Sequence, residues 1–216
     1  MIQRSEQKQA RLEFLTALGR KLELLGFSTM TREQCYYRDN GSGKWVLHIA
    51  FIPHAQDIDL TADIAIRIGA VEDLVNQYDT KLSPQEKRNS MTLGGELGNL
   101  SVGKNIRFTI DYATSISTIC DQVLEQFEVV GIPLLHRYSD IGEVHRLLSS
   151  SDRTDTVLCP FKGPRYMRAV AAASILGTDI SINALIRQFD AELAQDRDLY
   201  QADFRTMSKA LFPASL

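Results

Sequence analysis

The feature of this chain that most limits its fold is the strict alternation of apolar and polar positions over residues 57–68. Isoleucine, leucine and alanine occupy every second position, and most residues between them are polar or charged. Successive side chains of a β-strand point to opposite faces of a sheet, so one face is buried and the other is wet. Because parallel strands are covered on both faces, the pattern favours an antiparallel sheet covered on one side. Residues 105–112 repeat it.

Helices are predicted on both sides of the strands. Leucines at spacings of three and four give residues 3–25 one apolar face, which is typical of an amphipathic helix. Strands are predicted over 34–39 and 45–52, joined through a run of turn-forming residues at 39–43. The other predicted helices cover 70–79, 115–130, 140–149, 164–177, 182–196 and 199–211, with Gly131 and Pro133 expected to stop the second of these.

The order of these elements predicts an α+β fold, because strands and helices are segregated along the chain. We expect an antiparallel sheet of about four to five strands, packed on one face by the N-terminal helix and the following helices, with a helical C-terminal third. The 216 residues predict a single domain over 1–216. Within it, 1–150 would be the helix–sheet–helix core and 151–216 a helical C-terminal appendage.

The amino-acid composition indicates which partners and which cellular compartment to expect. The net charge is −3, so there is no global cationic field and we expect no nucleic-acid partner. Three cysteines without a CxxC pair indicate a reducing compartment, and charges throughout the first 25 residues are unlike a secretory signal. No apolar run is long enough for a membrane helix. We therefore expect a cytoplasmic protein with no membrane association.

Several short motifs resemble the bacterial family known as domain of unknown function 4304, over roughly residues 10–150. The motifs are Gly26-Phe27, Tyr37-Arg38, Trp45, Ile66-Arg67-Ile68-Gly69 and Gly131-Ile132-Pro133-Leu134-Leu135, which leads to Tyr138-Ser139-Asp140. The family has no established activity. The resemblance therefore implies a fold and a bacterial setting, and it implies no chemistry.

The wet face of the alternating strands is the first candidate functional surface. Its residues are Asp57, Asp59, Asp63, Arg67, Arg107 and Asp111. A row of carboxylates attracts either a basic protein partner or a hard cation, and it is also the ordinary solvent side of a sheet. Because no glycine turn or bidentate-ligand spacing accompanies the row, we predict a partner-binding face and no metal site.

The second candidate is a basic segment where a helix is predicted to begin. Lys162, Arg165 and Arg168, together with backbone N–H groups, would hold a phosphate or carboxylate. Pro164 removes one of those N–H groups, and cations at a helix N-terminus oppose the helix dipole. An anion-binding segment and ordinary surface charge are the two interpretations.

Other residues with chemical potential lack a recognisable catalytic pattern. His48, His54, His136 and His145 form no HxH or HExxH motif, and Cys159 has no histidine beside it in sequence. The glycine-rich run 94–98 lacks the order of a phosphate-binding loop. The surrounding polar segment 80–104 is expected to be a long connection, with a short strand near 96–102. We expect no cofactor and no catalytic residue set.

Two functions follow from these patterns. The first is a non-enzymatic protein-binding protein of a bacterial cytoplasm, such as an immunity protein or an antitoxin-like neutraliser of a toxin. The alternative is an enzyme or sensor that binds an anionic small molecule or nucleotide through residues 162–168, with His136 or His145 as the acid or base. Partner identity and homodimer formation stay open at this point.

Overall fold

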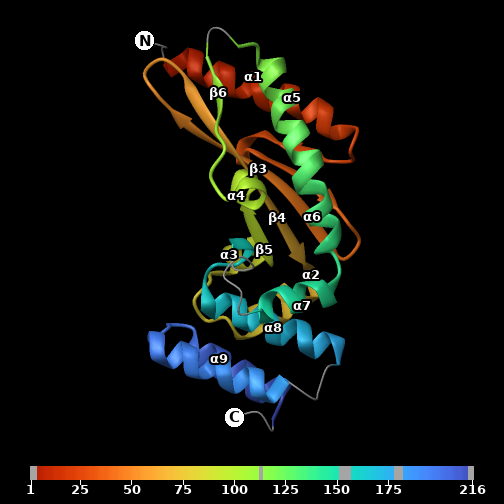
Figure 1. The fold of residues 1–216 in the computed structure, drawn as a ribbon, viewed down its shortest axis with the longest axis vertical. Helices are drawn as coiled ribbons and strands as arrows, with labels where there is room; N and C mark the ends of the chain where they lie inside the picture. Colours follow the sequence, from red (N-terminus) through yellow and green to blue (C-terminus); the bar gives the residue numbers. More distant parts are fainter. Residues whose placement is uncertain (1–3, 112–113, 151–156, 178–181, 214–216) are drawn as a thin grey trace. The chain divides into compact units, whose positions relative to one another are not determined.

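The computed structural model describes residues 4–111, 114–150, 157–177 and 182–213 (Figure 1). It has an α+β fold with an antiparallel sheet and a helical C-terminal part, as predicted. The six strands of the sheet are β1 (Ser28–Met30), β2 (Cys35–Asp39), β3 (Gly43–Pro53), β4 (Ile58–Ile68), β5 (Leu93–Glu96) and β6 (Phe108–Ile110). Their order is β1-β2-β3-β4-β5, and β6 pairs with the start of β4.

The alternation over 57–68 is confirmed as strand β4. Every second side chain from Ile58 to Ile68 is buried, and those between them are partly exposed. The hairpin is also confirmed, because β2 and β3 pair antiparallel with Asp39 opposite Lys44. The second alternating segment forms only the short strand β6, whose Ile58–Ile110 pairing sets its register. Residue 112 of that prediction lies outside the described residues.

The helices follow the predicted order with two corrections. Their bounds are α1 (Arg4–Glu23), α2 (Gly69–Tyr78), α3 (Pro84–Asn89), α4 (Leu97–Val102), α5 (Ile116–Gln126), α6 (Ile132–Arg137), α7 (Ile141–Ser149), α8 (Lys162–Leu176), α9 (Ile182–Asp196) and α10 (Gln201–Leu211), with short η1 (Thr31–Glu33) and the π-helical turn η2 (Phe127–Gly131). The expected strand near 96–102 is wrong, since α4 occupies it. The segment 80–104 therefore holds α3, β5 and α4 rather than one long connection.

The second correction concerns the expected stop at Gly131 and Pro133. The chain runs from α5 through η2 directly into α6, and the N–H of Ile132 donates to the Phe127 carbonyl. A π turn shifts the hydrogen-bond register by one residue, which accommodates a proline that would interrupt a regular helix. Gly131 is needed there because a Cβ atom would lie 2.5 Å from the Phe127 ring and 3.2 Å from Ile64.

The chain divides into two compact units, which we describe separately. Unit 1 comprises Met1–Ala65 and Gly95–His136, and unit 2 comprises Ile66–Gly94 and Arg137–Leu216. The predicted border at residue 150 does not coincide with this division, because unit 2 joins the last third of the chain to residues 66–94. That the whole chain is a single domain stays a prediction.

In unit 1 the inner face of the sheet packs on helices. The rings of Phe14 on α1 and Phe51 on β3 meet edge to face at 5.9 Å, and the Tyr36 hydroxyl donates to the Leu15 carbonyl at 2.9 Å. Figure 1 shows α1 and α5 side by side, and Lys21 and Asp121 join them with an ion pair of 2.8 Å. Burial of these apolar side chains is the main stabilising term for such a layer.

In unit 2 the core is helical. Helix α8 buries a run of small residues against its neighbours, and Tyr166 on α8 stacks on Phe189 of α9 with ring centroids 3.8 Å apart. Phe189 in turn meets Phe204 of α10. Among the helices that the structure describes, none combines the length and the apolar composition needed to cross a membrane.

Candidate functional site

The side of the unit 1 sheet that points away from α1 and α5, here called the outer face, carries most of the predicted partner-binding residues. It includes Tyr37, His48, Ile52, Asp59, Asp63 and Thr109. His48 on β3 and Asp63 on β4 approach to 3.2 Å, with 39% and 36% of their side chains exposed. The alternation of β4 places the Asp63 carboxylate on the exposed face, where it meets His48 of β3. The sequence did not indicate this pairing, because the two residues lie on different strands.

Asp59 is the most engaged carboxylate of this face. Its Oδ1 accepts a hydrogen bond from the Thr109 hydroxyl at 2.8 Å, and its Oδ2 lies 3.1 Å from His54 Nε2 and 3.4 Å from Arg107 Nη1. The Thr109 bond lowers the pKa of Asp59, against the opposing effect of partial burial, and His54 and Arg107 lower it further. Asp59 therefore ties β4 to β6 and to the β3–β4 turn.

Replacing Thr109 by valine is expected to raise the pKa of Asp59, because valine has no hydroxyl to donate to the charged form. A ¹³C NMR titration of the aspartate carboxyl groups measures this directly. Thr61→Val is the matched control, since Thr61 lies two residues from Asp59 on the same strand. An equal pKa of Asp59 in both variants would contradict the assignment.

His54, Asp57 and Asp59 form the group closest to a metal-binding arrangement among the described residues. One ligand atom from each lies within 4.8 Å of the others. Asp59 already accepts from Thr109 and lies beside Arg107, a cation that opposes a metal ion at the same carboxylate. The three side chains are partly or fully exposed, so the arrangement is that of an ordinary charged turn.

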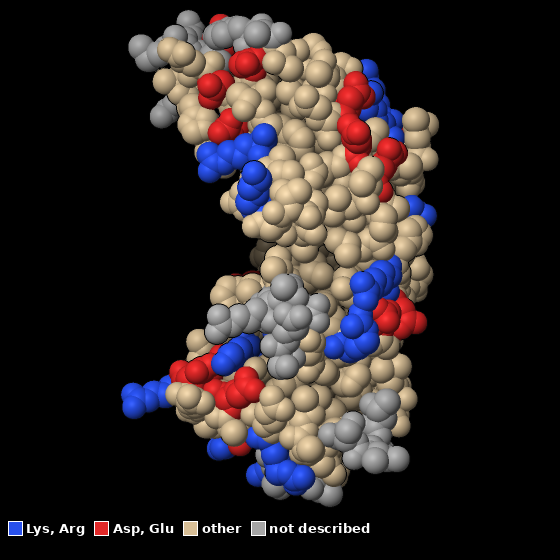
Figure 2. All heavy atoms as spheres, in the orientation of Figure 1, with Lys and Arg blue, Asp and Glu red and all other residues tan. Residues whose placement is uncertain are grey.

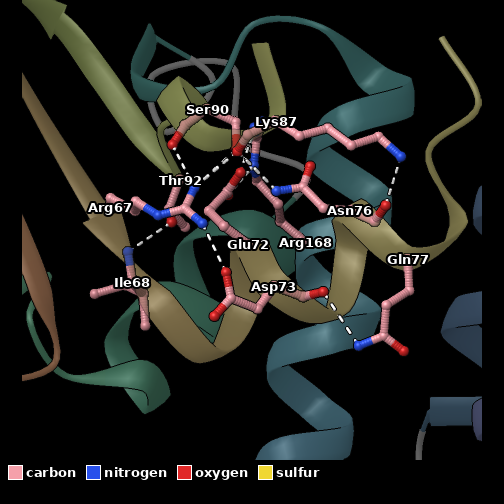
Figure 3. Close-up of polar contacts among 10 residues, drawn as sticks. All are labelled: Arg67, Ile68, Glu72, Asp73, Asn76, Gln77, Lys87, Ser90, Thr92 and Arg168. Carbon is pink, nitrogen blue, oxygen red and sulfur yellow. Dashed lines mark hydrogen bonds and ion pairs between the residues drawn. The ribbon is translucent and has the colours of Figure 1, made fainter. Parts of the chain in front are cut away.

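Two other residues of the predicted face serve local structure. Arg67 lies in unit 2, where its Nη1 donates to the Ser90 carbonyl at 2.8 Å and its Nη2 pairs with Asp73 at 2.7 Å (Figure 3). Asp111 accepts from the Thr114 N–H at 2.7 Å. Within the predicted set, Asp57 and Asp63 are therefore the carboxylates best able to accept hydrogen bonds from a partner.

Each cation of the basic segment has its own partner within the chain. Lys162 pairs with Asp196 at 2.7 Å. Arg165 is buried and donates from Nε to the Leu148 carbonyl at 3.0 Å and from Nη2 to the Ser150 carbonyl, which holds the end of α7 against α8. Lys162 and Arg165 thus bind helix α8 to α9 and to the end of α7.

Arg168, the third cation, forms a buried pair with Glu72. Its Nε lies 2.6 Å from Oε1 and its Nη2 3.2 Å from Oε2, the bidentate geometry in which arginine binds carboxylates best (Figure 3). Glu72 is fully buried and 12% of the Arg168 side chain is exposed. Burial by itself raises the pKa of Glu72, but the Arg168 charge and hydrogen bonds from Arg168, Ser90 and Thr92 bring it below its ordinary value.

His136 and His145, the candidate acid or base of the alternative function, and Cys159 all make contacts within the fold. The His136 ring meets Trp45 edge to face at 4.7 Å, and His145 Nδ1 lies 3.0 Å from the Ala169 carbonyl. Cys159 is buried, and burial raises the pKa of its thiol even though Arg168 lies beside it, so it is a poor nucleophile.

The glycine-rich run is not a phosphate loop, because a carboxylate already occupies its amides. Glu96 accepts from the N–H groups of Gly98 and Asn99 at 2.8 and 2.9 Å and caps α4. A phosphate would need those same donors. The structural role of this run is therefore to cap helix α4.

The structure also reveals a hollow that the sequence analysis missed. It lies beside α1, has a volume of about 470 Å³, and is bordered by Lys8, Arg11, Leu12, Arg32 and Phe51 among others. We call it the α1 hollow. No local signal in the sequence placed Arg32 or Phe51 beside Lys8 and Arg11.

The fold is α+β, with a partly exposed charged face on its sheet and a hollow beside α1. Figure 2 shows acidic and basic side chains interspersed in small groups on the face in view. Comparisons with family models, with curated proteins and with solved structures find no match for this chain. The resemblance to domain of unknown function 4304 therefore stays a prediction.

Proposed function

We propose that this chain is a non-enzymatic protein-binding protein that uses the outer face of the unit 1 sheet. The observation that carries the proposal is the position of Asp63 and His48, which lie partly exposed on adjacent strands of the sheet. Tyr37 and Ile52 on the same face are also partly exposed. A mixture of aromatic, aliphatic and charged side chains on one open face is the composition of a protein interface.

The charge of the face indicates the kind of partner. Asp57, Asp59, Asp63 and Asp111 outnumber the cations Arg107 and Lys44. Arg107 is paired with Asp59, and Lys44 lies over the Tyr37 ring. Such a face steers a basic protein surface toward it and disfavours an acidic one. An immunity protein or antitoxin that covers a basic surface of a bacterial toxin is the function we favour. The alternative through residues 162–168 loses support, since those cations are bonded within the chain.

The partner can be captured with a photo-crosslinking amino acid placed at Thr61, in the middle of β4. We expect one protein to be crosslinked from this position in cells of the source organism, and not from Gln122, an exposed residue of α5. Mass spectrometry of the crosslinked peptide identifies the partner and its contact segment, which should be basic. Crosslinking of the same protein from Gln122 but not from Thr61 would contradict the proposed face.

Charge reversal then tests the energetics with the purified partner. Asp57→Lys combined with Asp63→Lys is expected to weaken binding at least about tenfold at low salt and less at high salt, because it opposes like charges across the interface. Glu125→Lys on α5 is the matched control and should leave the dissociation constant within about twofold. Equal affinities for both variants in a calorimetric titration would rule out the outer face.

A further inference from the structure

We propose that the α1 hollow binds a small organic anion with an apolar body. The hollow lies on the side of the sheet that packs against α1, so it is separate from the outer face and does not depend on the proposed function. Its volume of about 470 Å³ is within the range of ligand pockets in proteins. Helix α1, η1 and the end of β3 all contribute to its lining.

The charges of the hollow are of one sign. Lys8, Arg11 and Arg32 border it, and none of the described residues that line it is acidic. Most other cations discussed above, such as Lys21, Arg107 and Lys162, lie within 3.4 Å of a carboxylate. Within the described residues no carboxylate pairs with these three cations. They repel one another around one concavity, and a bound anion relieves that repulsion.

Arg11 carries a second and independent indication. Its Nε atom is buried and has no hydrogen-bond partner in the described structure. Its guanidinium lies 5.5 Å from the centroid of the Phe51 ring, so the side chain is held by a cation–π contact while a donor stays unused. Buried donors in native proteins are almost always satisfied, which makes this N–H a candidate for a ligand oxygen.

The apolar part of the lining defines the rest of the ligand. Leu12 is 48% exposed, and Leu15 and Phe51 continue the apolar surface. Thr31 and Gln34 offer further polar groups at the rim. The chemistry fits a carboxylate, phosphate or sulfonate head near Arg11 and Arg32, with an aromatic or aliphatic body against the leucines and Phe51.

The test uses two probes that share one aromatic body and differ by a sulfonate group. 8-Anilinonaphthalene-1-sulfonate has an aromatic body and an anionic head, and N-phenyl-1-naphthylamine has the same body without the sulfonate. In fluorescence titrations of the folded protein we expect the sulfonate probe to bind at least about tenfold more tightly than the neutral probe. Equal affinity for the two probes, or no binding of the sulfonate, would overturn the proposal.

Variants then locate the site. Arg11→Gln and Arg32→Gln are each expected to raise the dissociation constant of the sulfonate probe about tenfold and to leave the neutral probe unchanged. Arg32 is exposed, so its replacement tests the site even if Arg11→Gln impairs folding. Arg20→Gln, an exposed cation on the same helix α1, is the matched control and should have no effect. Unchanged sulfonate binding in Arg32→Gln would show that the probe binds elsewhere and would refute the site.

Discussion

Replacing Arg168 by methionine is expected to lower the free energy of unfolding by about 3–5 kcal/mol, the largest effect we predict for a single substitution. The reason is that Glu72 is fully buried and loses both of its short contacts to the guanidinium, at 2.6 and 3.2 Å. The free-energy cost of desolvating an ion exceeds the stabilisation from a single weak contact. An unpaired buried carboxylate therefore destabilises the fold. Urea denaturation at neutral pH measures the change.

The double variant Glu72→Met with Arg168→Met separates the charge from the packing. We expect it to recover most of the stability lost in Arg168→Met, because two apolar side chains leave no buried charge behind. Arg205→Met is a control for removing an arginine from an exposed pair with Asp190, and it should cost less than about 1 kcal/mol. A double variant no more stable than Arg168→Met would show that the charge of Glu72 is not what destabilises it.

The pH dependence gives a further check with a definite sign. The pKa of Glu72 is below its ordinary value in the folded protein, so the contribution of the pair is present above a pH of about 4.3 and is lost as the pH falls through the folded pKa. In Arg168→Met, burial raises the pKa of Glu72 instead. The stability difference between the native protein and this variant should therefore shrink as the pH is lowered, and a constant difference would contradict this account.

Replacing Gly98 by alanine is expected to lower the free energy of unfolding by about 2–3 kcal/mol. An added Cβ atom would lie 2.4 Å from the Ile106 backbone nitrogen and 2.6 Å from the Lys104 carbonyl oxygen. Backbone atoms cannot move aside as the end of a flexible side chain can, so the loop between α4 and β6 must shift. Chemical denaturation, with circular dichroism to confirm the fold, provides the measurement.

Gly95→Ala, in the neighbouring strand β5, is the matched control. Its added Cβ atom would meet only the Leu100 side chain, at 3.3 Å, and the leucine can adjust by a few tenths of an ångström. We expect a change of less than about 1 kcal/mol. If Gly98→Ala proves as stable as Gly95→Ala, the close backbone approach at Ile106 is not a constraint on the fold.

The amino-acid sequence was enough to predict the helices and strands that have a long hydrophobic pattern or a capping residue at one end. The alternation of β4 is a consequence of the strand pleat, so buried and wet positions follow from spacing alone. Asp140 caps α7 by accepting from the Glu143 N–H at 2.9 Å, the three-residue spacing of a capping box. Short elements were mispredicted, because α4 depends on the Glu96 carboxylate and α6 on the π turn before it.

The positions of the residues around each site were decided only by the tertiary structure. Arg168 and Glu72 are 96 residues apart in the chain, and no local pattern indicates that the basic segment would meet a buried carboxylate. The α1 hollow likewise needs α1, η1 and β3 to converge before its cations and Phe51 share one space. Whether a charged side chain is paired depends on which side chains, distant in sequence, lie beside it in the folded protein. Whether a strand residue is buried or exposed follows from its position among its neighbours along the chain. Secondary structure could therefore be inferred from the amino acids in order, while the candidate sites required the fold.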